Sequence, residues 1–137
     1  MFSVTFNKFN IFVADVANKI HNLGSDTITV ALSDTTPVAT NTVQSNITEI
    51  SYTNLSARAV TVTSSSQSSG TYKLVANQLT LTASGTVAQF RYVVLYNSTS
   101  AGKNLIGWYD YGSEVNMVNG DTFIVGFDLT NGVLTIA

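Results

Sequence analysis

The sequence predicts a mainly β fold, a two-layer β-sandwich or jelly-roll-like domain with one N-terminal α-helix. Two patterns predict it. Apolar residues recur at spacings of three and four near the N-terminus, and beyond residue 26 they alternate with a period of two. Clusters of Asn, Gly and Ser then separate the alternating stretches at intervals of about ten residues, as turns separate short strands.

The helix is predicted at about residues 8–23. Its apolar side would carry Phe9, Phe12, Val13, Val16, Ala17, Ile20 and Leu23. Asn7 is expected to cap the start of the helix, and Gly24 is expected to adopt the left-handed conformation that ends it.

Eight to ten strands follow. We expect them at residues 26–32, 47–52, 58–63, 71–75, 78–83, 87–97, 105–111, 114–118, 122–128 and 133–136. The strand at 87–97 is apolar on both faces, which is typical of a central strand. A Ser/Gly-rich loop is expected at 64–70. Asn119–Gly120 and Asn131–Gly132 predict two hairpins that join the last three strands.

The chain has 137 residues and no break in composition, so we expect one domain over residues 1–137. Only 10% of the residues are charged, against roughly 25% in an average soluble domain. Polarity comes instead from 19 Thr, 15 Ser and 13 Asn. Neutral hydroxyl groups cost less to desolvate than charges, so such a surface favours contact with neighbouring protein subunits.

The charge pattern and the length of the apolar runs argue against two classes of partner, nucleic acids and membranes. A net charge of −2 and six scattered basic residues argue against a nucleic-acid partner. No apolar run is long enough for a membrane span. The start of the chain lacks a basic leading region, and Asp15 interrupts its apolar stretch, so we expect no signal peptide and a protein made in the host cytoplasm.

No residue pattern predicts catalysis, a metal site or a cofactor. His21 is the single histidine, and nothing places it beside a nucleophile and an orienting carboxylate. Asp110, Glu114, Asp121 and Asp128 lie in the C-terminal third without a calcium-loop spacing, and turn formation explains them equally well. We therefore expect that the protein is not an enzyme.

Two groups of apolar residues are candidates for an interface. Chain ends fray unless they are tied down, so the apolar N-terminus, with Met1, Phe2, Val4 and Phe6, is interpreted as a contact with a neighbour. Trp108 and Tyr109 lie in an aromatic stretch and face opposite sides of one strand. They are candidates for core packing, for a protein interface or for a carbohydrate platform.

Several stretches resemble small proteins encoded among the virion structural genes of tailed bacteriophages. The elements are Phe-Asn-Lys-Phe at residues 6–9, His-Asn-Leu-Gly-Ser-Asp at 21–26 and Thr-Pro-Val-Ala at 36–39. Further elements are Phe-Arg-Tyr-Val-Val-Leu-Tyr-Asn at 90–97 and Leu-Ile-Gly-Trp-Tyr-Asp-Tyr-Gly at 105–112. The resemblance covers nearly the whole chain.

The resemblance implies a virion component. We expect a capsid decoration (cement) protein that binds the major capsid protein on the surface of the assembled lattice and associates with itself, with a trimer favoured. The alternatives are a tail or adaptor component, and a host-attachment module that binds carbohydrate through Trp108 and Tyr109.

Overall fold

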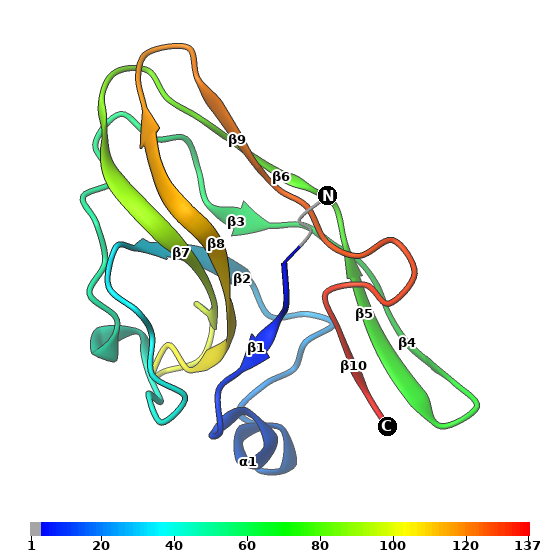
Figure 1. The fold of residues 1–137 in the computed structure, drawn as a ribbon. Coiled ribbons are helices and arrows are strands. Elements are labelled where there is room, and N and C mark those ends of the chain that lie inside the picture. The colour runs from blue at the N-terminus through cyan, green and yellow to red at the C-terminus, as the bar shows by residue number, and fades with distance from the viewer. Residues whose placement is uncertain (1–3) are drawn as a thin grey trace.

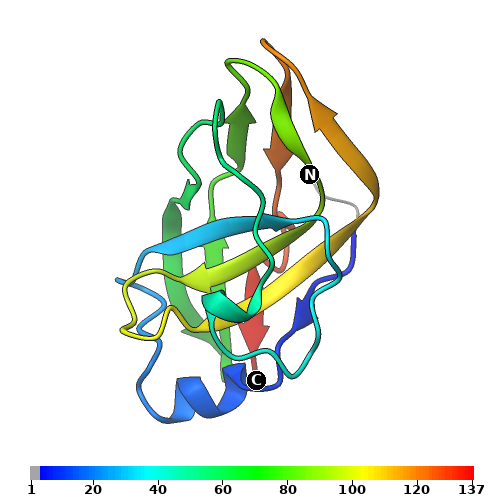
Figure 2. The same cartoon turned by 90° about the vertical axis from the view of Figure 1, so that its left-hand side faces the viewer.

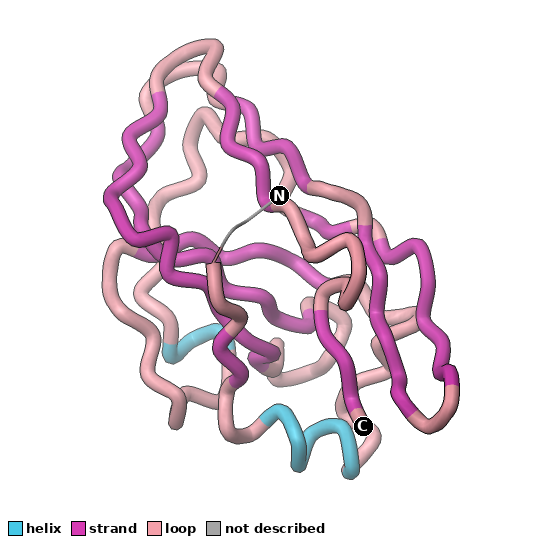
Figure 3. The backbone as a smooth tube through the Cα atoms, turned by 45° about the vertical axis from the view of Figure 1, so that its right-hand side comes forward, coloured by secondary structure: helices cyan, strands magenta, loops and turns pink. Residues whose placement is uncertain are grey.

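The fold is mainly β and sandwich-like, as the sequence predicts. The computed structural model describes residues 4–137. In chain order the elements are β1 (Asn7–Lys8), α1 (Phe12–Ala17), β2 (Ile28–Ser33), the 3-10 helix η1 (Gln44–Asn46), β3 (Ala59–Val60), β4 (Val62–Ser68), β5 (Thr71–Ala76), β6 (Leu79–Thr82), β7 (Val87–Asn97), β8 (Leu105–Met117), β9 (Thr122–Val125) and β10 (Leu134–Ile136). The two helical segments, α1 and η1, lie at the periphery of the molecule, beside the sheets (Figure 3).

One layer is a five-stranded antiparallel sheet in the order β1-β8-β7-β2-β3 (Figure 1). β7 lies at its centre, where Val93 pairs with Tyr109 of β8 and with Leu32 of β2. The strand that is apolar on both faces is therefore the central strand, as predicted. β8 runs without a break from Leu105 to Met117, so the two strands expected at 105–111 and 114–118 are one.

The second layer consists of two smaller antiparallel sheets, β10-β5-β4 and β6-β9. The main core lies between the layers. It includes Val30 and Phe90 from the large sheet, and Leu74, Leu81 and Val125 from the small sheets, each with no exposed surface. Burial of each such side chain contributes about 1.5–3 kcal/mol. This shared core holds the layers together.

The other face of the five-stranded sheet is covered by the connection between β2 and β3, residues 34–58 (Figure 2). Ile47 packs there in a second buried cluster with Val94 and Leu105. Tyr52 fixes the connection to β2, because its hydroxyl accepts a hydrogen bond from the Leu32 N–H at 3.0 Å and donates one to Glu49 at 2.5 Å. The expected strand at 47–52 is absent, and a single bridge between Ser33 and Glu49 replaces it.

The predicted helix at 8–23 is wrong in its extent, because α1 covers only Phe12–Ala17. Lys19 has φ of 63°. The Lys19 N–H donates to the carbonyl of Val16, and the Ile20 N–H donates to that of Asp15, the bond pattern of a Schellman motif. Helix termination thus occurs at Lys19 instead of Gly24. Asn7 lies in β1, and it does not cap the helix.

Both Asn-Gly turns form, with φ of 90° at Gly120 and 72° at Gly132, but the predicted strand pairings are wrong. β9 pairs with β6 and β10 pairs with β5. At the first turn the chain passes from the large sheet to the other layer, where the Gly120 N–H donates to the carbonyl of Ala83. The Ser-rich segment expected to be a loop is most of β4, and only Ser69 and Gly70 form its turn.

Candidate protein-binding surfaces

The N-terminal segment is packed along the edge of the large sheet. β1 pairs with β8, so that Asn7 lies opposite Trp108. The ring of Phe6 lies across Gly107, where a Cβ atom would be 2.3 Å from it, and its centroid is 5.5 Å from that of Tyr109. Val4 and Phe6 are partly buried against the main core. The described part of the N-terminus therefore contacts its own domain, and Met1 and Phe2 lie outside the described residues.

Trp108 and Tyr109 face opposite sides of β8, as their alternation predicts. Tyr109 is 5% exposed and belongs to the main core, where burial raises the pKa of its hydroxyl. Trp108 is partly exposed and packs on Phe9, with ring centroids 4.6 Å apart. Of this pair, only Trp108 presents surface to a partner.

The carboxylates of the C-terminal third hold separate local structures. Asp110 forms an ion pair with Arg91 at 2.8 Å, which lowers the pKa of the Asp110 carboxyl. Asp121 accepts the N–H of Val118 at 2.9 Å within the first Asn-Gly turn. Asp128 accepts the backbone N–H groups of residues 130 and 131. Within residues 4–137, no group of three or more His, Asp or Glu side chains could hold a metal ion.

His21 belongs to a buried polar cluster that joins the N-terminal segment to the loop between β7 and β8. Its side chain has no exposed surface, and its Nδ1 lies 3.1 Å from the Nδ2 of the fully buried Asn97. Asn97 also donates to Asp26 at 2.6 Å. The imidazole Nε2 is 3.9 Å from Asp15 Oδ2 and has no hydrogen-bond partner. Burial lowers the pKa of His21, and Asp15 and Asp26 oppose that effect.

The hydrogen bonds of this cluster fit a role in packing better than a role in catalysis. Ser100, the buried serine nearest in the network, donates its hydroxyl hydrogen bond to the backbone carbonyl of Asn97 and accepts one from the Asn104 N–H. Asn104 in turn donates to Asp15 at 3.0 Å. Apart from His21 Nε2, these polar groups satisfy one another inside the fold, so they hold two chain segments together.

An open groove runs between α1 with its following loop and the β10-β5-β4 sheet. Its larger part has a volume of about 630 Å³ and is lined mainly by Val16, Leu23, Gly24, Ser65, Tyr72 and Ile136. A second hollow of about 280 Å³ shares Val16 and Ile136 and continues past Val13, which is 55% exposed. We call this surface the α1 groove. The sequence did not indicate it, because its walls come from segments more than forty residues apart.

Comparison with protein-family models, with curated proteins and with solved structures found no match. Among residues 4–137 no helix has the length and apolar character that crossing a membrane requires.

Proposed function

We propose that the protein is a structural component of a bacteriophage particle, a decoration protein that binds the assembled capsid lattice. The observation that carries the proposal is the low charge of the chain, 14 charged residues in 137, on a mainly β fold. The resemblance of several sequence stretches to phage virion proteins is the reason for proposing a bacteriophage particle.

The exposed surface fits repeated protein contacts. Two of the few ionisable groups are withdrawn from solvent, Asp15 at 7% exposure and His21 at 8%. Arg91 and Asp110 neutralise each other as an ion pair. What remains is largely hydroxyl and amide surface, which a neighbouring subunit can cover at low desolvation cost.

The proposed mechanism is the sum of many weak contacts. Each copy binds only where several capsid subunits have already assembled, so binding favours the assembled shell by mass action. The α1 groove and the partly exposed Trp108 are the surfaces we assign to the major capsid protein. Self-association belongs to the proposal too. The sequence-based expectation is a trimer, and the molar mass in solution distinguishes a trimer from a dimer.

Electron microscopy tests where on the particle the protein binds. Particles of the encoding phage are prepared without this chain, purified protein is added, and the particles are sedimented and imaged by electron microscopy. The proposal predicts saturable binding and density at lattice-related positions on the capsid facets. A Val13→Asp variant, which puts a carboxylate at an exposed position of the α1 groove, should lose binding, whereas Thr80→Asp, exposed on β6, should keep it.

Other outcomes reject the proposal in distinct ways. Density on the tail alone assigns the chain to the tail or adaptor. Absence from both capsid and tail, together with glycan binding that Trp108→Ala abolishes, assigns it to host attachment.

A further inference from the structure

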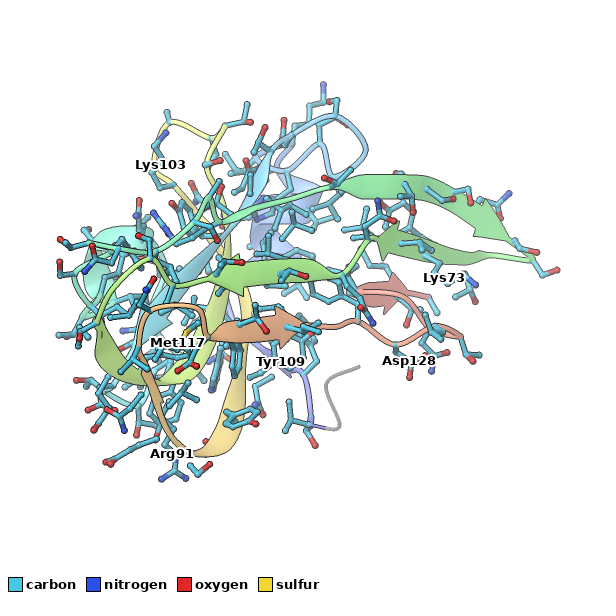
Figure 4. The ribbon with its side chains drawn as sticks, turned by 90° about the horizontal axis from the view of Figure 1, so that it is seen from above. Lys73, Arg91, Lys103, Tyr109, Met117 and Asp128 are labelled. Atoms are coloured by element: carbon cyan, nitrogen blue, oxygen red, sulfur yellow. The ribbon has the colours of Figure 1, made fainter. Side chains whose placement is uncertain are left out.

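β4 is the longest of the strands that lie at the outside of a sheet in the described part of the fold. It has 7 residues and lies at the outside of the β10-β5-β4 sheet. The other outer strands, β1, β3, β6, β9 and β10, have between 2 and 4 residues. The β4–β5 hairpin, which carries Lys73, extends beyond the rest of the molecule (Figure 4).

This edge lacks the features with which proteins usually block strand pairing. Edge strands are commonly protected by charged residues, proline or bulges. Residues 61–70 contain no charged residue and no proline, and every residue from Thr63 to Gly70 is exposed. The single irregularity is a register shift between Val62 and Ser64, at the end of β4 that is nearer to the core.

The hairpin turn shows which backbone groups are free. Ser69 and Gly70 have φ of 51° and 84°, the two left-handed residues of a type I′ turn. Such a turn makes Ser68 and Thr71 a hydrogen-bonded pair. Because hydrogen-bonded and non-hydrogen-bonded pairs alternate, the opposed residues Gln67 and Tyr72 are not hydrogen-bonded to each other. The N–H and C=O of Gln67 therefore point away from β5, and so do those of Ser65.

We propose that a second copy of this chain occupies the β4 edge, with the two β4 strands antiparallel across a two-fold axis. Ser65 and Gln67 are the outward-facing residues between the register shift and the turn, so the axis passes beside Ser66. Gln67 of one copy then lies opposite Ser65 of the other, and each of these pairs exchanges two backbone hydrogen bonds. The two hairpin sheets become one continuous sheet.

A second copy fits this edge because the strand is compatible with itself. Antiparallel self-pairing about Ser66 places residues of the same strand opposite each other, where like charges would repel. β4 has no charge, so its serine hydroxyls and glutamine amides meet without repulsion. A two-fold contact also closes after two copies, so it does not propagate into fibres.

The pairing is expected to be weak in solution. A contact limited to one strand edge is smaller than the roughly 1,200–2,000 Å² of a stable interface. It is therefore expected at micromolar to millimolar concentrations, and it strengthens where copies are held side by side. This inference rests on the hairpin alone and does not depend on where the protein acts.

Molar mass measured by light scattering over a concentration series tests the pairing. The chain has a mass of 14.6 kDa, and we expect the measured value to rise towards twice that mass. Gln67→Pro removes the outward N–H and leaves the β4–β5 bonds intact, so it should stay at the mass of one copy. Gln67→Thr is the control. It loses the same side-chain acceptor for the Gly70 N–H but keeps its own N–H, so it should still pair.

Cross-linking gives a second readout that does not depend on proline being tolerated. The chain has no cysteine, so a single introduced thiol reports one position. Directly opposed residues of a non-hydrogen-bonded pair are close enough for a disulfide. Under oxidation Ser66→Cys should form a covalent dimer much faster than Thr71→Cys, which is also exposed but lies on β5.

Three results would overturn the pairing: a mass of one copy throughout with equal cross-linking of the two cysteine variants, a mass of three copies, or a Gln67→Pro variant that still pairs. A chain that is monomeric alone but needs the Gln67 N–H to bind particles would assign the edge to another protein. Loss of particle binding with pairing intact would reject the proposed function and leave the pairing standing.

Discussion

At the scale of single residues, left-handed backbone positions shape turns within the layer of small sheets. Gly132 has φ of 72°, and a Cβ atom there would lie 2.2 Å from the carbonyl oxygen of Leu74. Gly70 has φ of 84°, but nothing lies within 4 Å of a Cβ atom at that position. An alanine at Gly70 would meet backbone strain alone, whereas an alanine at Gly132 would meet both backbone strain and a steric clash.

We predict that Gly132→Ala destabilises the fold more than Gly70→Ala. The left-handed conformation costs about 1–2 kcal/mol for an alanine at either site. At Gly132 the added methyl group must also displace the β5 backbone, which costs roughly a further 1–3 kcal/mol. Urea unfolding followed by circular dichroism measures both. Equal losses would show that contact with Leu74 does not constrain the turn.

Lys19 is the residue-scale counterpart at the end of α1. Its φ of 63° strains a side-chain-bearing residue. Lys19→Gly should be more stable than Lys19→Ala by about 1 kcal/mol, because only glycine relieves the left-handed strain. Both variants lose the same charge, so the difference in their unfolding midpoints isolates the backbone effect. A more stable alanine variant would contradict the Schellman termination.

At the scale of elements, local patterns predicted strands well and their partners poorly. The sequence pattern predicted β7 as a strand. It also predicted the central position of β7, because a strand buried on both faces carries apolar residues on both faces. The Asn-Gly turns were also local and were found, but β9 leaves β8 to pair with β6, a choice set by packing between layers. β4 was missed because pairing with β5 makes a serine-rich segment extended despite its turn-like composition.

The helix was overestimated for a related reason. Phe9, Phe12 and Leu23 are buried, as a continuous helix would also require. Ile20 is 40% exposed, because the chain turns at Lys19 and Leu23 reaches the core from a loop. Val13 lies within α1 and is 55% exposed. Spacing alone cannot separate these two routes to burial.

The loop after α1 should make stability depend on pH through His21. Burial lowers its pKa below the ordinary value of 6.5 in the folded state. Above pH 6.5 the His21 imidazole is mostly neutral in both the folded and the unfolded state. As the pH falls below 6.5, the imidazole of the unfolded chain takes up a proton more readily than that of the folded protein. Stability should therefore fall between pH 7 and pH 5, and the loss is complete below the folded-state pKa.

Urea unfolding at a series of pH values tests this prediction, with His21→Gln as the control. The variant should lose most of the decline in that window. Asp110 and Asp128 have carboxyl pKa values lowered from 3.8, so they titrate below the window. Parallel curves for the two proteins would show that His21 is not the group responsible.

At the scale of the whole molecule, the large sheet is covered on both faces, by the small sheets on one side and by residues 34–58 on the other. This arrangement leaves the proposed interaction surfaces at the periphery, in the α1 groove, at Trp108 and along the β4 edge. The sequence predicted Trp108 as a candidate. It did not indicate the groove or the edge, because both depend on which strands become neighbours.

The proposed function is that the protein reinforces an assembled phage shell. The most direct test is to heat particles of the phage proposed to encode it, prepared with and without this chain, and to record the temperature at which the genome is released. The proposed function predicts release at a higher temperature when the chain is present, with the difference restored by adding purified protein. Identical release temperatures at saturating protein would contradict it.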